Sequence, residues 1–539
     1  MSNITLLING HIYLNRGQFA EALLIEDGII QAVGTTAALT AQTPEGANVV
    51  DLQGRTVIPG FNDSHLHLAM KGQTLDDIDL LGAESIAEVT RRVTEYIARR
   101  NPSPGTVLHG RGWNQDYFAA DNHRLLTRED LDAMTTEFPL ILERACGHIL
   151  TANSLALEMA GITRDSTPVD GGEYDRDENG DLVGIVRENA CDTVLAIIRT
   201  PTDEDVKRQL VQAMHYALSN GVTSVQTMDM RPRNWEQMWR LYDEIAQENP
   251  LVRIYHQVNF MEPNGFQRFL DAGFRTGVGS DFNRIGPLKM FLDGSLGART
   301  ALMRQPYHDD PSVTGIATLT PEQTANMVRL AVENDCQVAM HAIGDGAIER
   351  ALDAYLPYTQ NGENPHRLGV VHVQITDNGL LERFAQQQVL AYVQPIFLHY
   401  DISIVEDRVG EELAGTSYAF RTLLHNGTPV SLGTDCPVEE ISPFDNLYCA
   451  VTRRNLRGEP AEGFHMEQAL DIYEAIDAYT VGSAYVSFEE NVKGRLLPGY
   501  FADLVVLSDD IFTVAPEDIR HVRAMATMTN GRFVFERTE

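Results

Sequence analysis

Two histidines two residues apart, His65 and His67, are the residues of this chain most clearly suited to chemistry. They end the apolar run 57–68, which is interrupted at Pro59-Gly60. Residues i and i+2 of an extended strand point to the same face, so both imidazoles can reach one metal ion. Such a short pattern often arises by chance. The hypothesis of a metal site therefore depends on what the chain supplies at the ends of its other strands.

Further candidate ligands end later strand-like runs. His341 ends an apolar run before a glycine turn, His372 ends the next run, and Asp435 closes the last one. Taken singly, such a histidine is more often a hydrogen-bonded core residue, and such an aspartate a turn or capping residue. Together they predict a site for a divalent ion, most simply zinc. Asp435 could both bind the metal and accept the proton of an attacking water.

Lys289 lies in the otherwise apolar run 288–292. Lysine is almost never fully buried unless it is paired or chemically altered. Either Lys289 pairs with Asp293 or Asp435, or its amine has become a carbamate that bridges two metals. The spacing leaves both interpretations open. Cys436 adjoins Asp435 but has no basic partner in the sequence, and we interpret it as structural.

Eight strand-like runs, mostly apolar on both faces, alternate with helix-like runs and would position these residues. A parallel sheet covered by helices requires this pattern, and eight such units close into a barrel with its chemistry where the strands end. We therefore predict an α/β chain with a (β/α)8 TIM-like barrel over residues 58–484. The strand runs are the one ending at His65 and then 222–228, 252–260, 288–292, 337–341, 368–373, 389–394 and 429–434; the helix runs include 203–220, 235–247, 321–334, 347–355 and 377–388.

Two further regions complete the predicted organisation. Short alternating strands at both ends of the chain predict one small β-sandwich domain, built from residues 1–57 and 485–539. The first and second barrel strands are much farther apart than an ordinary connection allows, which predicts an insertion over residues 69–200. We expect the insertion to be a substrate lid over the barrel mouth; an oligomer contact is the alternative.

Composition narrows the class of protein. The 539 residues include 42 Lys and Arg against 76 Asp and Glu, and the net charge of −34 argues against a nucleic-acid or anionic-membrane partner. Five dispersed cysteines favour neither a disulfide framework nor a thiolate zinc site. The chain begins without a signal-peptide pattern and has no apolar run near the ~18 residues of a membrane span. We expect a cytoplasmic protein that binds a small molecule, with a homo-oligomer left open.

The motifs around these residues resemble the amidohydrolase superfamily. The His-x-His strand, the strand-end histidines, the last-strand aspartate and the split β-domain fit that superfamily. More specific segments resemble its YtcJ-type, amidohydrolase-3 branch, which includes N-substituted formamide deformylases. They are K-x-F-x-D-G-S-L from Lys289, H-A-I-G-D from His341, L-G-T-D ending at Asp435, G-Y-F-A-D-L-V-V-L over 499–507 and, in the insertion, 110–114, 144–148 and 153–157.

The resemblance implies a metal-dependent amidohydrolase. It implies that His65, His67 and Asp435 bind the more buried metal. Lys289, as N6-carboxylysine, would bridge to a second metal held by His341 and His372. A metal-bound hydroxide would attack the carbonyl of a non-peptide C–N bond in an amide, formamide or cyclic amide, and Asp435, the catalytic residue, would pass the proton to the leaving nitrogen.

Substrate contacts and the reaction itself are less constrained. Trp113, Tyr117 and His148 in the insertion are candidate substrate residues, although an aromatic in a large domain is more often plain packing. Gln394 and His399 follow the seventh strand and would lie at the catalytic rim of the barrel. The same metal centre could act on an ester or lactone, or deaminate a ring. A barrel that only binds a ligand is the non-enzymatic alternative. The natural substrate, the metal identity, the number of metals and the oligomeric state stay open at this level.

Overall fold

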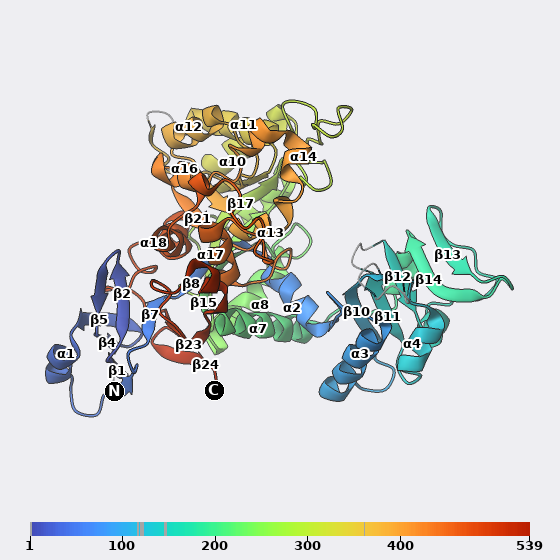
Figure 1. Ribbon diagram of the computed structural model, residues 1–539, viewed down its shortest axis with the longest axis horizontal. Helices are drawn as coiled ribbons and strands as arrows, with labels where there is room; N and C mark the ends of the chain where they lie inside the picture. The colour runs from blue at the N-terminus through green and yellow to red at the C-terminus, as the bar shows by residue number, and fades with distance from the viewer. Residues whose placement is uncertain (1–2, 116–117, 119–122, 145–147, 360–361, 539) are drawn as a thin grey trace. The chain divides into compact units, whose positions relative to one another are not determined.

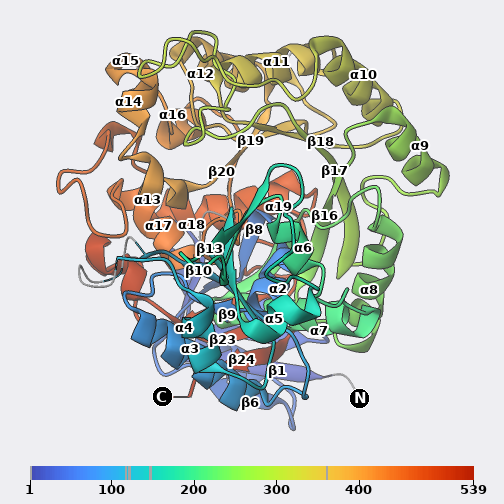
Figure 2. The ribbon, with the colours of Figure 1, turned by 90° about the vertical axis from the view of Figure 1, so that its right-hand side faces the viewer.

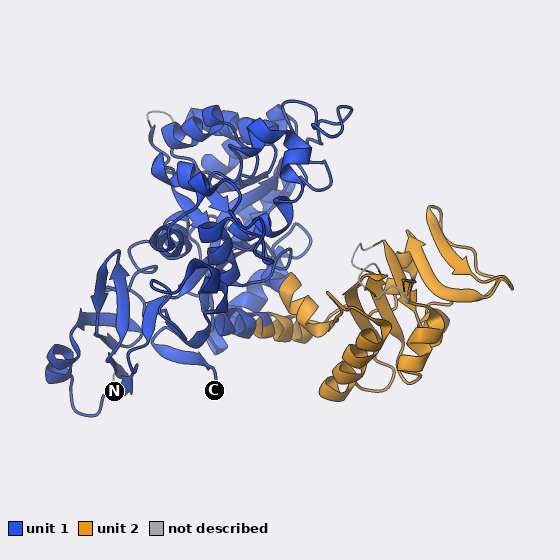
Figure 3. Cartoon of the chain, in the orientation of Figure 1, with its two compact units in different colours: residues 1–69, 213–539 blue, residues 70–212 orange. Residues whose placement is uncertain are grey.

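The computed structural model describes residues 3–115, 118, 123–144, 148–359 and 362–538. The chain divides into two compact units, coloured separately in Figure 3. Unit 1 comprises residues 1–69 and 213–539, and unit 2 comprises residues 70–212. Among the described residues, no helix is both long enough and apolar enough to cross a membrane.

Unit 1 contains an eight-stranded, entirely parallel sheet that is nearly closed into a barrel, as predicted. Figure 2 shows helices α8 (Trp235–Glu248), α9 (Pro263–Asp271), α10 (Pro321–Val332), α11 (Asp345–Tyr355) and α12 (Asn378–Gln387) around the outside of the strands. The strands are buried on both faces, and several of them, such as the first, carry buried polar residues beside the apolar ones. In order they are β8 (Phe61–Leu66), β15 (Val222–Thr227), β16 (Arg253–Asn259), β17 (Asn283–Phe291), β18 (Val338–Ala342), β19 (Gly369–His372), β20 (Leu390–Val393) and β21 (Val430–Leu432).

The first and last strands meet at a polar seam. The backbone N–H of Asp435 donates to the carbonyl of His65 at 2.8 Å. The buried carboxylate of Asp63 accepts from the backbone N–H of Thr434 at 3.1 Å, from its hydroxyl at 2.7 Å and from the Tyr479 hydroxyl at 3.1 Å. The close approach requires glycine at 433, where a Cβ would lie 2.7 Å from the backbone nitrogen of His65. The seam thus joins the two strands that carry His65 and Asp435.

Strand β17, the fourth of the barrel in chain order, begins at Asn283 rather than at the predicted residue 288. Pro287 lies inside it, and proline normally argues against a central strand because it cannot donate to the ladder. Here the register with β16 shifts between His256 and Val258, opposite this part of β17. A bulge of this kind accommodates the missing N–H.

Strands from the two ends of the chain form two further sheets in unit 1 (Figure 1). The break at Pro59-Gly60 separates β7 (Thr56–Pro59), which pairs with β22 (Leu504–Leu507), from the barrel strand β8. Buried side chains of both sheets, such as Leu23 and Met528, share one hydrophobic cluster. One sheet has the order β5 (Ile29–Gly34), β4 (Ala22–Glu26), β1 (Ile4–Ile8), β6 (Asn48–Asp51), and the other β24 (Arg532–Glu536), β23 (Ala524–Thr529), β22, β7, β2 (His11–Asn15), β3 (Gln18–Ala20).

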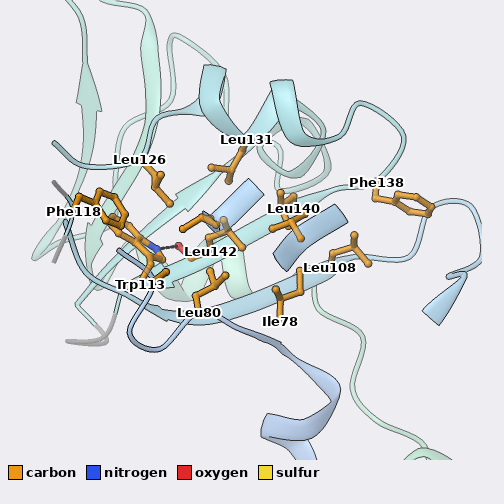
Figure 4. Packing of buried hydrophobic residues seen from close by; sticks show 13 residues of the cluster. Ile78, Leu80, Leu108, Trp113, Phe118, Leu126, Leu131, Phe138, Leu140 and Leu142 are labelled. Atoms are coloured by element: carbon orange, nitrogen blue, oxygen red, sulfur yellow. Dashed lines mark hydrogen bonds between the residues drawn. The ribbon is translucent and has the colours of Figure 1, made fainter. Parts of the chain in front are cut away.

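Unit 2 has a sheet and hydrophobic cores of its own. Helix α3 (Ile86–Arg100) begins after Ser85, whose side chain caps it by accepting from the backbone N–H of Glu88. Its Val89 and Val93 pack with Trp113 in the cluster drawn in Figure 4. The sheet order is β13 (Gly172–Arg176), β14 (Leu182–Glu188), β12 (Ile149–Ala152), β11 (Leu140–Arg144), β10 (Leu108–Trp113), β9 (Ile78–Asp79).

A partly buried charge triad links strands β10 and β11 of unit 2 to the residue that precedes β9. The His109 ring lies 3.0 Å from Asp77 through Nδ1 and 3.5 Å from Glu143 through Nε2. Burial alone would lower the pKa of His109, but the two carboxylates outweigh it and raise the pKa to about 9.

The triad predicts a pH-dependent stability. Because the pKa of His109 is raised by folding, its contribution is fully present below the ordinary histidine pKa of about 6.5 and is lost as the pH rises through about 9. The shift corresponds to at most on the order of 3 kcal/mol. We expect His109→Gln to lower the melting temperature at pH 6 and to flatten its decline between pH 6.5 and 9, measured by calorimetry. An unchanged slope would assign that decline to other groups.

Candidate metal centre

Side chains from the first, sixth and eighth barrel strands converge at the carboxyl ends of the sheet. His65, His372 and Asp435 each offer a ligand atom, and these atoms all lie within 4.8 Å of one another. The Nε2 atoms of His65 and His67 lie 3.4 and 3.1 Å from Oδ1 of Asp435. His65, His372 and Asp435 are buried, and His67 is only slightly exposed. The structure therefore brings together four of the six predicted ligands.

Two of these histidines lie against glutamine side chains. Nδ1 of His65 lies 2.6 Å from Oε1 of Gln257, and Nδ1 of His372 lies 2.8 Å from Oε1 of Gln394. Nδ1 of His67 lies 3.4 Å from the carbonyl of Met228. In His65 the remaining nitrogen faces Asp435, as a metal ligand requires.

The electrostatics of the centre favour neutral imidazoles beside an ionised carboxylate. Burial lowers the pKa of His65 and of His372 well below its ordinary value. Burial also acts to raise the pKa of Asp435, but the neighbouring histidines outweigh this effect and hold the pKa well below its usual range. Neutral imidazole and carboxylate are the forms that bind a metal cation.

The backbone at two ligands is strained. His372 has φ 83° and Asp435 has φ 58°, the left-handed region that non-glycine residues rarely adopt. Each such residue costs on the order of 1 kcal/mol or more. The surrounding structure holds both residues there, and the strained conformations coincide with the ends of the strands that supply the ligands.

Lys289 is completely buried and, within the described chain, its Nζ has no hydrogen-bond partner. It lies 4.3 Å from the centre of the Phe291 ring. The structure shows no ion pair from Lys289 to Asp293 or Asp435 among the residues it describes, so the predicted pairing is not present. Burial lowers the pKa of Lys289 to about 7, which leaves much of the amine uncharged at neutral pH.

His341 lies beside the centre with one nitrogen turned away from it. Its ring is 4.5 Å from that of His372, measured between centroids. Its Nε2 lies 3.0 Å from the carbonyl oxygen of Gly294 and 3.3 Å from Oδ1 of Asp293. The Asp293 carboxylate also accepts three backbone N–H groups, from Leu302, Ile343 and Gly344. Sequence reasoning had considered Asp293 only as a partner for Lys289, and the structure gives it this bracing position instead.

The other predicted site residues have different surroundings. The side chain of Gln394 contacts His372, one of the candidate metal ligands. Nδ1 of His399 accepts the backbone N–H of Leu456 at 3.2 Å. The mostly exposed His148 pairs with Glu188 at 2.9 Å within unit 2. Tyr117 lies outside the described residues.

Trp113 is fully buried in the core of unit 2 (Figure 4). Its indole N–H donates to the carbonyl of Leu142 at 3.0 Å, so its one polar group is satisfied inside that core. This placement accounts for Trp113 by packing and leaves no surface of its side chain for a substrate.

The donor set fits a divalent metal. Oδ1 of Asp435 is buried, and the groups that face it among the described residues include Nε2 of His67 at 3.1 Å and Nε2 of His65 at 3.4 Å. A buried acceptor of this kind is costly unless a cation or donor completes it. Imidazole nitrogens and a carboxylate are ligands that suit zinc and similar divalent ions, and here they lie at the carboxyl ends of barrel strands, where such barrels place their chemistry.

Comparison with known proteins identifies the family. A model of the amidohydrolase family matches residues 48–535, and the chain belongs to that family. It is 32% identical over 534 residues to a protein of Bacillus subtilis (strain 168) named as an amidohydrolase, YtcJ, with 98% of this chain and 99% of that protein covered. It is 25% identical over 535 residues to the N-substituted formamide deformylase of Arthrobacter pascens, covering 97% and 96%.

A solved structure agrees with the family assignment. The crystal structure of an uncharacterised metal-dependent hydrolase from Pyrococcus horikoshii OT3 superposes with a TM-score of 0.76 at 31% identity. The superposition covers 95% of this chain and 99% of that one. The protein is therefore an enzyme, a metal-dependent hydrolase of small molecules in the YtcJ-like branch of the amidohydrolases.

Proposed function

We propose that this enzyme hydrolyses a non-peptide C–N bond, such as that of an amide, a formamide or a cyclic amide. The observation that carries the proposal is the buried Asp435 carboxylate, whose Oδ1 faces Nε2 of both His65 and His67. Cleaving a C–N bond requires a proton on the leaving nitrogen, and this carboxylate can carry one. The similarity to an N-substituted formamide deformylase supports the same class of bond.

Zinc is the metal that we propose for the centre, because imidazole and carboxylate ligands suit it. His65, His67, His372 and Asp435 would hold it. Bound there, the metal would lower the pKa of a water molecule and polarise the substrate carbonyl. The barrel's residues supply the rest: burial keeps the imidazoles of His65 and His372 neutral, and the low pKa of Asp435 keeps its carboxylate ionised.

Asp435 would then move the proton. Its carboxylate accepts the proton of the attacking water and later donates it to the nitrogen that leaves, so the group returns to its ionised form. Burial keeps bulk water from taking part in this transfer, since the residue is 7% exposed.

In a centre with two metals, His372 would instead bind the second ion together with His341, and a carbamate on Lys289 would join that ion to the first. A lysine that is buried, unpaired and largely neutral can attack carbon dioxide through Nζ, forming an N–C bond and losing one proton to solvent. The product is a carboxylate, which could compensate the charge of two cations.

Two further proposals concern other parts of the chain. His148 and His399 stay candidates for substrate contact. The β-sheets formed by the two ends of the chain are proposed as one sandwich domain.

Metal removal tests the proposal. We expect chelation to abolish hydrolysis of N-formyl amines or cyclic amides and zinc to restore it, with activity and metal content followed on the same samples. Esters, lactones and aminated rings serve as the comparison panel. Turnover of only those compounds would contradict the C–N assignment, and full activity in metal-free protein would contradict the mechanism.

A further inference from the structure

We propose that Gln257 and Gln394 are positioning residues that fix the tautomer of His65 and His372 and so present Nε2 of each ring to the metal. The inference rests on the proposed function in one respect, that the centre binds a metal. The inference goes beyond the proposed function because it assigns a positioning role to two glutamines that neither bind the metal nor transfer the proton.

The geometry at Gln257 leaves one tautomer. Nε2 of Gln257 donates to the carbonyl of Ser64 at 2.9 Å, so its Oε1 is the atom that faces Nδ1 of His65, at 2.6 Å. An amide oxygen only accepts, and therefore Nδ1 must carry the proton. The lone pair of the ring is then on Nε2, the nitrogen 3.4 Å from Asp435.

Gln394 repeats the arrangement from another strand. Its Nε2 donates to the carbonyl of Tyr392 at 3.2 Å, and its Oε1 lies 2.8 Å from Nδ1 of His372. Gln257 belongs to β16, whereas Gln394 follows β20, so the two amides reach the centre from different parts of the barrel. Because the same bonding occurs at two independent positions, we infer that each glutamine orients the histidine ring that it contacts.

The choice of an amide also has an electrostatic consequence. Gln257 and Gln394 are 0% and 3% exposed, so a carboxylate in either place would put a second buried negative charge near Asp435. An amide oxygen fixes the proton on Nδ1 without adding charge. Because a partner of this kind holds the ligand in its binding form, its loss typically weakens metal binding about 10–100-fold.

The test compares matched substitutions in the full-length enzyme. Gln257→Met and Gln394→Met keep the volume but remove the acceptor, whereas Gln257→Glu and Gln394→Glu keep an acceptor in place. Gln226→Met is the control, because Gln226 is also buried on a barrel strand but donates to the Ser483 carbonyl rather than holding a histidine. Zinc dissociation constants are measured by competition with a chelator. In cobalt-loaded protein, the exchangeable Nδ1 protons are followed by paramagnetic NMR.

We expect each Met variant to bind zinc about 10–100-fold more weakly and to lose or broaden one Nδ1 proton signal. Gln226→Met should keep both, and the Glu variants should bind at least as tightly as the parent. If the Met variants do not fold, the Glu variants decide: weaker zinc binding by them would overturn the inference. Parent-like affinity and proton signals in the Met variants would also overturn it while leaving the metal centre intact. A parent that binds no metal would overturn the proposed function as well.

Discussion

Asp435→Asn is expected to lower turnover by about 10²-fold or more while much of the metal remains bound. The amide keeps an oxygen that can face His65 and His67, but it cannot accept the proton of the attacking water and return it to the leaving nitrogen. The loss should appear in kcat across all substrates. It is measured by steady-state kinetics together with metal analysis of the same preparation.

Asp401→Asn is the matched control for this prediction. Asp401 is another carboxylate that follows a barrel strand, and burial raises its pKa to about 6, but it accepts from the Tyr418 hydroxyl rather than facing the histidines. We expect its variant to retain turnover near that of the parent. Near-normal rates in Asp435→Asn would show that another group carries the proton.

His65→Asn is expected to have the second largest effect, a loss of metal affinity of more than about 100-fold. This loss exceeds the one typical of a residue that only hydrogen-bonds to a metal ligand, because here the ligand itself is removed. Activity should fall in proportion to metal content and recover in part at high zinc concentration.

Two controls separate loss of a ligand from general damage. His256→Asn removes another fully buried barrel histidine, one that is bonded to Asn283, and it should retain metal. Cys436→Ser changes the residue next to Asp435 and should also retain metal. Comparable metal loss in either control would mean that His65 acts through stability rather than as a ligand.

Much of the barrel could be predicted because its strands carry a simple signal. Runs such as 368–373 and 389–394 are mostly apolar on both faces, and the structure places strands within a residue or two of their predicted ends. The start of β17 was missed because Pro287 normally ends a strand, and only the register shift against β16 reveals how it is accommodated. The local sequence around Pro287 does not show how β17 pairs with its neighbour β16.

The candidate ligands were predictable for a related reason. His65, His372 and Asp435 are polar residues at the ends of apolar runs, which is where parallel barrels place their chemistry. Gln257 and Asp63 lie within strands and were not recognised, because a buried polar residue can be identified only from the atoms that satisfy it. In both cases the partners come from other strands.

The seam between β8 and β21 has a consequence for the order in which the enzyme matures. The carboxylate of Asp63 and the backbone of Thr434 are separated by 371 positions in the chain, and the ligands next to them are as distant. A growing polypeptide that already displays His65 and His67 cannot assemble the full set of ligands until Asp435 has been synthesised and the last strand has docked. Metal capture is therefore expected to be a late step of biogenesis, one that reports on completion of the whole ring of strands.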